Sequence, residues 1–336
     1  MHTSTVKPEI GIVVDAGPTL GYGHAVRCLR LAMALATRNK VVFYPLSEDC
    51  EKFLAGAAEN SGNSGTVRNS GLDPCFISSM GLTRNSSLSP NFPPLVITDL
   101  REGHGITAAI RRQGARHISI HDLGLAQCHS DVAIDGSITR LFPFATEKTR
   151  DLFLGPQYMI TREPVTRGKL NQSVLVSFGG GATARLAETI SNQLVGLGFT
   201  PITTRGFKGD SAPMADSELA AAMSNCSFAI SGSGVTLYDL LASGVPTIAV
   251  AFDRIQLRTA DAFHELGAVL SAGLMDRLTP AALMRCCKEM LENRPLVQRI
   301  TAAGQVLVDG KGLSRVVDIV RRQLWLTGQM KTYTAC

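Results

Sequence analysis

Short apolar runs alternate with segments of helical periodicity along almost the whole chain, and this alternation restricts the fold more than any other feature. Glu9 to Ala16 reads EIGIVVDA, and residues 23–36 follow with apolar side chains at helical spacing. SVLVSFGGG, from Ser173, precedes another helical segment in the same way. Because parallel strands need helical crossovers, the pattern predicts an α/β fold with two doubly wound sheets. Right-handed crossovers are expected to place the loops after the strands on one rim, facing a shared cleft.

The chain is long enough for two domains. It has 336 residues, whereas single cores usually stop growing near about 250 residues. A segment rich in proline, glycine and polar residues around Tyr158 marks the expected junction. We therefore expect an N-terminal domain over 1–160 and a C-terminal domain over 161–315. The amphipathic stretch 316–336 is a candidate to pack back on the N-terminal domain. Two insertions rich in Ser, Asn, Gly and Pro, 60–71 and 83–94, are expected to be surface loops.

Composition excludes several classes of protein. Apolar residues form 45% and charged residues 18% of the chain, as in a folded globular protein, and the formal net charge is +5. This mild basicity suits an anionic small molecule, but no basic run suggests nucleic acid. The sequence contains no stretch of about 18 or more apolar residues, so no transmembrane helix is predicted. The eight cysteines are scattered without metal-ligand spacing, so we expect reduced thiols in a cytoplasmic protein and no metal site. We also expect no cofactor.

Three expected strand-to-helix turns carry glycine clusters: Gly21–His24, Ser177–Thr183 and Ser231–Thr236. Glycine lets backbone N–H groups approach a ligand, and the start of the next helix favours phosphate. Three such turns favour a phosphate-bearing ligand. A dinucleotide fingerprint fits poorly because Val26 takes the place of its third glycine, and no Walker-type sequence is present.

His24 is the side chain in these turns best suited to catalysis. It follows Gly23 at the expected start of a helix, which disfavours an imidazolium and suits a general base. The alternative is a histidine that caps its helix. Arg27 would either bind an anionic ligand or pair with an acid, and Asp15 would either orient His24 or cap a turn.

The stretch from Asp15 to Ala32, DAGPTLGYGHAVRCLRLA, resembles the first motif of the nucleotide-sugar hydrolases of the pseudaminic-acid pathway and their spore-coat-polysaccharide relatives. The motif reads G-x-G-H-x-x-R-C-L-x-L-A. SGSGVTLYDLLASGVPTIAV, from Ser231, resembles the nucleotide-binding block of MurG-type glycosyltransferases. The resemblance implies a GT-B-like fold of two Rossmann-like domains, with UDP held mainly by the second. It also implies that the histidine matching His24 activates water, which attacks and inverts the anomeric carbon and expels the nucleoside diphosphate without a metal.

The residue patterns and the resemblance together predict a set of site residues. Catalysis is assigned to His24 and Asp15. The sugar side is assigned to Gly21, Tyr22, Gly23, Arg27, Asp99, Arg101, Tyr158, Arg162 and Glu163. The nucleotide side is assigned to Gly179, Gly180, Gly181, Ser231, Gly232, Ser233, Gly234, Thr236, Asp239 and Gln256.

Departures from the family concentrate on the sugar side. Arg101 stands where the hydrolases carry a tyrosine, and His121 with Asp122 replaces a pair of aspartates. Asp135 replaces an asparagine. In the nucleotide block, Asp239 replaces a glutamate and the asparagine before Gln256 is missing. The sugar or the acceptor is therefore expected to differ from the family's usual one.

Three functions fit these observations. The first is an inverting hydrolase of a UDP-amino-deoxysugar, and the alternative is a GT-B glycosyltransferase of cell-surface glycan biosynthesis that uses the same base. The third, a sugar-nucleotide binding protein without catalysis, has no need of His24. In each case the partner is a nucleotide sugar, and the protein is expected to be a monomer or a homodimer.

Overall fold

The computed structural model describes residues 7–18, 20–61, 91–100, 104–123, 129–140, 149, 151–178, 184–196, 198–204, 214 and 216–328. The chain forms two compact units. Unit 1 comprises 1–136, 140–154 and 313–336, and unit 2 comprises 137–139 and 155–312. Residues 62–90, which include most of both predicted insertions, lie outside the described residues.

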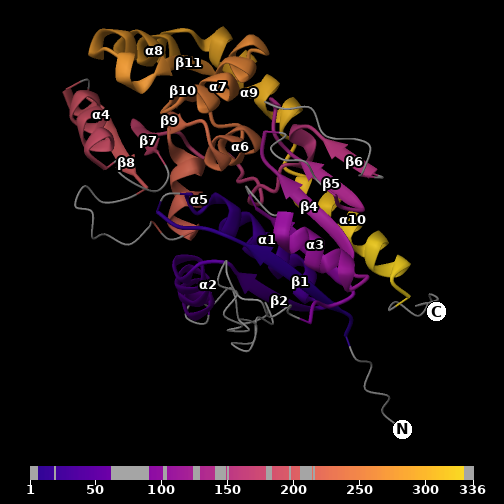
Figure 1. Ribbon diagram of the computed structural model, residues 1–336. Helices are drawn as coiled ribbons and strands as arrows, with labels where there is room; N and C mark the ends of the chain where they lie inside the picture. The colour runs from indigo at the N-terminus through magenta and orange to yellow at the C-terminus, as the bar shows by residue number, and fades with distance from the viewer. Residues whose placement is uncertain are drawn as a thin grey trace. The chain divides into compact units, whose positions relative to one another are not determined.

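Unit 1 is built on a six-stranded parallel sheet in the order β2-β1-β3-β4-β5-β6 (Figure 1). Its strands are β1 (Glu9–Val14), β2 (Lys40–Pro45), β3 (Leu95–Asp99), β4 (Arg116–His121), β5 (Val132–Asp135) and β6 (Asp151–Leu154). Its helices are α1 (Gly23–Ala36), α2 (Glu48–Ser61), α3 (His104–Arg112) and α10 (Gly312–Leu326). The first three strands are almost wholly buried, as the apolar runs predicted.

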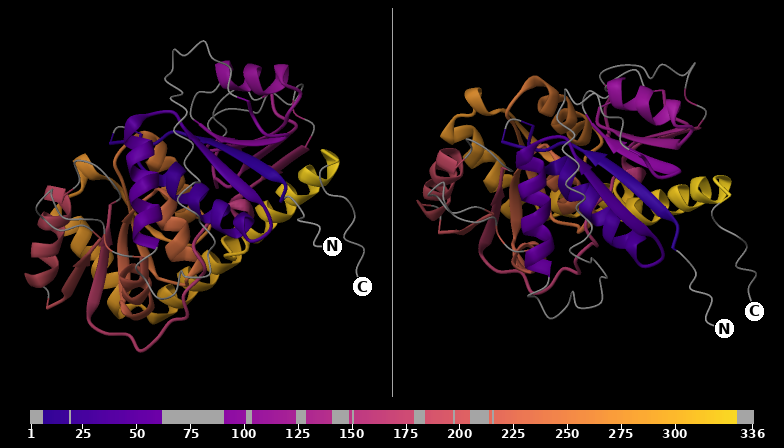
Figure 2. Two further views of the ribbon diagram at one scale, coloured as in Figure 1. Left: turned by 90° about the horizontal axis from the view of Figure 1, so that it is seen from below. Right: turned by 60° about the horizontal axis from the view of Figure 1, so that its bottom comes forward.

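The two faces of this sheet have different coverings. On one face Val13 and Val96 pack with Ile110 of α3. On the other face Arg116 of β4 donates a hydrogen bond of 2.9 Å to Gln323 of α10. Figure 2 shows α3 and α10 on opposite sides of the sheet. The C-terminal helix is thus part of unit 1.

Unit 2 contains a five-stranded parallel sheet in the order β11-β10-β9-β7-β8. Its strands are β7 (Ser173–Ser177), β8 (Thr200–Thr203), β9 (Phe228–Gly232), β10 (Thr247–Ala251) and β11 (Leu270–Leu274). Its helices are α4 (Ala184–Gly196), α5 (Asp216–Asn225), α6 (Val235–Ala242), α7 (Arg254–Glu265), α8 (Pro280–Glu292) and α9 (Arg294–Leu307), with short 3-10 turns at η3 (Pro156–Tyr158) and η4 (Met275–Arg277).

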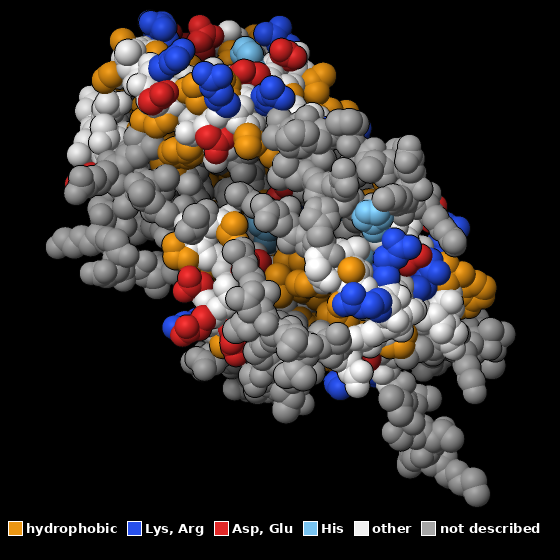
Figure 3. All heavy atoms as spheres, viewed as in Figure 1, with side chains coloured by type: hydrophobic (Ala, Val, Ile, Leu, Met, Phe, Trp, Pro, Cys, Tyr) orange, Lys and Arg blue, Asp and Glu red, His pale blue; other side chains and the backbone are white. Residues whose placement is uncertain are grey.

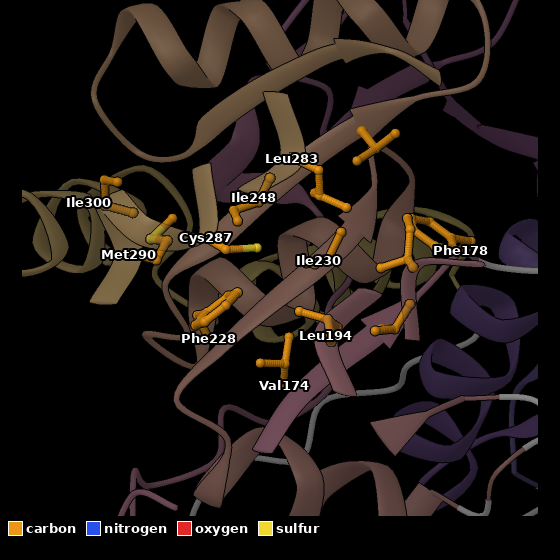
Figure 4. Close-up of a cluster of buried hydrophobic side chains, with 13 residues drawn as sticks. Val174, Phe178, Leu194, Phe228, Ile230, Ile248, Leu283, Cys287, Met290 and Ile300 are labelled. Atoms are coloured by element: carbon orange, nitrogen blue, oxygen red, sulfur yellow. The ribbon is translucent and has the colours of Figure 1, made fainter. Parts of the chain in front are cut away.

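Apolar side chains fill both sides of this second sheet. Figure 4 shows Val174, Phe228 and Ile248 of the strands packed with Leu283 and Cys287 of α8. A second cluster of α6 and α7 side chains covers the opposite face. Two separately packed cores, each around a parallel sheet, confirm the predicted α/β class with two doubly wound domains.

Charged side chains of both signs lie together on one face of unit 2. Figure 3 shows lysine and arginine side chains interspersed with acidic ones on the end where α8 lies. Mixed charge of this kind is the usual solvated surface of a folded domain. Every helix that the structure describes is too short or too polar to span a membrane.

Candidate functional site

The site in unit 1 lies where its parallel strands end. β3 ends at Asp99, and β4 ends at His121 with Asp122 directly after it. Parallel strands bring their carboxyl ends to one edge of the sheet, where α/β proteins bind ligands. β1 ends at the same edge and leads into a turn before α1.

This turn fixes the start of α1. Gly17 and Gly21 form an isolated antiparallel bridge, with a hydrogen bond of 2.7 Å from the N–H of Gly21. Gly21 has a φ of 80°, a conformation that favours glycine. Tyr22 is the N-cap residue, and its ring lies 4.8 Å from that of Phe53 in α2. The turn therefore positions His24 as the second residue of the helix.

His24 belongs to a cluster of four charged or titratable side chains. Its Nδ1 lies 2.5 Å from Oδ1 of Asp99. Arg27, one turn further along α1, donates to the same carboxylate from Nε at 2.5 Å and from Nη2 at 2.6 Å. Its Nη1 donates to Oδ1 of Asp122. One guanidinium thus joins two carboxylates, and both carboxylates lie beside His24.

Burial and pairing together set the charges of this cluster. Burial acts to raise the pKa of Asp99, but Arg27 and then His24 hold it well below its ordinary value. Asp122 follows the same pattern, and its pKa is lowered. The pKa of Arg27 is raised because the two carboxylates outweigh its burial. Both carboxyl groups are therefore ionised and act only as hydrogen-bond acceptors.

An ionised Asp99 at Nδ1 selects the tautomer of a neutral His24. Nδ1 carries the proton that Asp99 accepts, and Nε2 keeps the lone pair. Nε2 lies 3.5 Å from Oδ2 of Asp122. The arrangement can hold an imidazole in one orientation and present its second nitrogen to a proton donor, as a general base requires.

The structure shows which of the predicted partners the side chains of this site have. Asp99, rather than Asp15, contacts the His24 ring. Asp15 accepts from the Ser47 hydroxyl at 2.6 Å and from the N–H of Ala16 at 3.0 Å, the turn-capping alternative. Arg27 pairs with acids, the second of its two predicted roles. Arg101 lies outside the described residues.

Asp122 is a member of the cluster that sequence reasoning did not assign to the site. It was noted only as a departure from the resembling family. Its place directly after a buried strand was the available signal, because strand ends meet at this edge. Cys28 was also missed, and its thiol lies 3.5 Å from Oδ2 of Asp99. Burial raises the pKa of this thiol, and Asp99 raises it further, so the sulfur stays protonated.

In unit 2 the predicted nucleotide residues gather where β9 meets α6. Ser231 and Gly232 end β9, and Gly234 is the N-cap residue of α6. A Cβ on Gly232 would lie 3.1 Å from the Phe252 ring. Ser233 is 5% exposed, and within the described part of the chain its hydroxyl has no hydrogen-bond partner.

A helix start and an unpartnered hydroxyl suit an anion at this position. Gln256 lies close by, since its Oε1 is 3.8 Å from the position of a Gly232 Cβ. Thr236 is the second residue of α6. Gly179, Gly180 and Gly181 lie outside the described residues.

Two of the remaining predicted residues of unit 2, Asp239 and Arg162, contact each other. Asp239 is 3% exposed, and its Oδ1 accepts a 2.9 Å hydrogen bond from the N–H of Arg162. The Arg162 side chain is buried with Nη1 3.7 Å from the sulfur of Met223. Glu163 is exposed, and Tyr158 ends the η3 turn. For Asp239 this contact is a structural one, and its binding of a nucleotide stays a prediction.

The two parallel-sheet units define the GT-B fold class, and solved structures share it. MurG of Acinetobacter baumannii superposes with a TM-score of 0.62 at 16% identity, covering 94% of this chain and 100% of that one. The glycosyltransferase of kitacinnamycin gives 0.63 at 15% identity, with 95% and 99% covered. A UDP-N-acetylglucosamine 2-epimerase gives 0.58 at 10% identity, with 98% and 99% covered.

Among curated proteins, the chain is similar to the spore coat polysaccharide biosynthesis protein SpsG of Bacillus subtilis strain 168. The two are 23% identical over an alignment of 347 residues, which covers 93% of this chain and 98% of that protein. The predicted resemblance to spore-coat-polysaccharide proteins and to the MurG fold is confirmed. No family model matches the chain. No cluster of three or more potential metal ligands occurs among the described residues.

Proposed function

We propose that this protein is a nucleotide-sugar-dependent enzyme in which His24 takes a proton from the attacking hydroxyl. The bonded pair of His24 and buried Asp99 at the carboxyl edge of the unit 1 sheet carries the proposal. The hydroxyl oxygen forms a bond to the anomeric carbon, and its proton moves to Nε2. The bond from that carbon to the phosphate oxygen breaks, and its electron pair leaves with the nucleoside diphosphate.

The start of α6 supports a diphosphate site in unit 2. Ser233 buries a hydroxyl without a partner among the described residues, and Gly234 opens the helix. A phosphate oxygen would satisfy both that hydroxyl and the first N–H groups of α6. The resemblance from Ser231 onwards favours UDP as the nucleotide.

The proposal leaves two possible acceptors for the sugar, water and an alcohol. The resemblance at Gly21–Ala32 favours water, and with it the hydrolysis of a UDP-amino-deoxysugar of the pseudaminic-acid kind. The GT-B neighbours that are named as glycosyltransferases favour transfer to an alcohol. So does the similarity to a protein named for polysaccharide biosynthesis. On the comparisons alone, transfer has the stronger support.

The test is the release of UDP from UDP-amino-sugars, with and without an added alcohol. We expect His24→Ala to lower kcat by about 10²- to 10⁴-fold, because only the proton acceptor is lost. UDP affinity, measured by calorimetry, should stay within about threefold. His264→Ala is the matched control, because His264 lies on α7 of unit 2 and bonds the Val269 carbonyl. Turnover that survives the loss of His24 would exclude this residue as the base.

A further inference from the structure

The space between His24 and Asp122 is the least buried part of the charged cluster. The side chain of Asp99 is 0% exposed and that of Arg27 is 2% exposed. Those of His24 and Asp122 are 9% and 27% exposed. The distance from Nε2 to Oδ2 is 3.5 Å, well beyond the usual length of about 2.9 Å for a direct hydrogen bond. It is short enough for one oxygen atom to contact both.

Arg27 holds the Asp122 carboxylate in place. Its Oδ1 accepts from Nη1 of Arg27, which is itself fixed by Asp99. With Oδ1 held in this way, Oδ2 lies on the side of His24.

We propose that Oδ2 of Asp122 holds the attacking nucleophile together with Nε2 of His24, and that Asp122 thereby selects water over an alcohol. The inference rests on the proposed function and decides its acceptor. A water molecule has two protons and can donate one to each atom. An alcohol has a single proton, so its oxygen lone pairs would face a carboxylate that can only accept.

The displacement balances with water in this position. The water oxygen bonds to the anomeric carbon, and one proton moves to Nε2. The bond from that carbon to the diphosphate oxygen breaks, and its electron pair leaves with the diphosphate. The second proton stays on the new sugar hydroxyl, still directed at Oδ2. Asp122 is thus a catalytic residue that orients the nucleophile, whereas Asp99 orients the base.

The experiment measures how methanol competes with water. A UDP-amino-sugar that the wild-type protein cleaves is incubated in aqueous methanol, and methyl glycoside and free sugar are quantified. We expect the wild type to form almost only free sugar. Asp122→Ala should raise the ratio of methyl glycoside to free sugar at least about tenfold and lower kcat about 10²-fold, with KM within about threefold.

Two further variants separate orientation from folding. Asp122→Asn keeps an oxygen for Arg27 but presents an amide donor toward His24, so its kcat should fall about as far. Asp131→Asn is the matched control: Asp131 lies at the other end of the same sheet and accepts from the N–H of His117 at 2.9 Å. It should keep the wild-type ratio and kcat.

An unchanged product ratio in Asp122→Ala, or a wild type that prefers methanol, would overturn the inference and leave the nucleotide-sugar proposal standing. If the wild type released UDP from no nucleotide sugar, with or without an alcohol, the proposed function would fail and this inference with it.

Discussion

A buried histidine in unit 1 predicts how the stability of the protein depends on pH. His117 lies on β4, is 1% exposed, and its Nε2 is 2.9 Å from the Thr98 hydroxyl. Burial lowers the pKa of His117 to about 4, against the opposing charge of Asp131. The folded protein therefore keeps this ring neutral at pH values where an unfolded chain would protonate it.

The expected loss of stability follows from the two pKa values. The ordinary pKa is 6.5 and the folded one about 4. One pKa unit corresponds to about 1.4 kcal/mol, so the difference corresponds to roughly 3 kcal/mol. Between these values the unfolded state binds more protons, so the free energy of unfolding falls as pH falls. Above about pH 6.5, His117 does not lower the free energy of unfolding. By about pH 4 the full loss has occurred, and between these values the free energy of unfolding changes by about 1.4 kcal/mol per pH unit.

His117→Gln isolates this effect, because glutamine does not titrate and can still bond the Thr98 hydroxyl. Urea denaturation between pH 7 and 4.5 would be followed by the fluorescence of Trp325, the single tryptophan of the chain, which lies on α10 of unit 1. We expect the wild type to lose about 2–3 kcal/mol more than the variant over this range. Parallel pH curves for the two proteins would refute the reasoning. His264→Gln, in unit 2, should follow the wild type.

Two other expectations concern buried polar groups. Ser233→Ala should weaken UDP binding by about 5- to 10-fold in calorimetry without lowering the melting temperature, because the hydroxyl has no partner among the described residues until a phosphate binds. Unchanged affinity would place the phosphate elsewhere. Asp99→Asn should cost about 3–5 kcal/mol in urea denaturation, since it removes a wholly buried charge from Arg27 and His24. A cost below about 1 kcal/mol would mean that the cluster contributes little to stability.

The sequence predicted strands such as β1 and β7, in which most residues are apolar and almost all are buried. Burial on both faces of a sheet is what such runs indicate. The four-residue strands β5 and β6 were not predicted. β6 reads DLFL and is only half-buried at the sheet edge, so too few apolar residues occur together to give a signal.

The site was predictable where its residues share one helix. His24 and Arg27 stand one turn apart on α1, so their juxtaposition follows from helical geometry alone. The partner of His24 is 75 residues away, and pairing at that distance depends on which strand lies next to β1. The turn before α1 and the start of α6 were recognised from their glycines, but the unpartnered Ser233 hydroxyl needed side-chain packing to be seen.

The choice between Asp15 and Asp99 shows how a one-residue difference in position decides the partner of a base. Both aspartates follow apolar runs on adjacent strands, so the sequence offers both. In the sheet, Asp99 is in register with Val14, and residues in register point to the same face. Side chains alternate along a strand, so Asp15, the residue after Val14, is directed to the other side. There it meets Ser47, while Asp99 meets α1. The carboxylate that orients His24 therefore comes from β3, at the position that is in register with Val14 and not with Asp15.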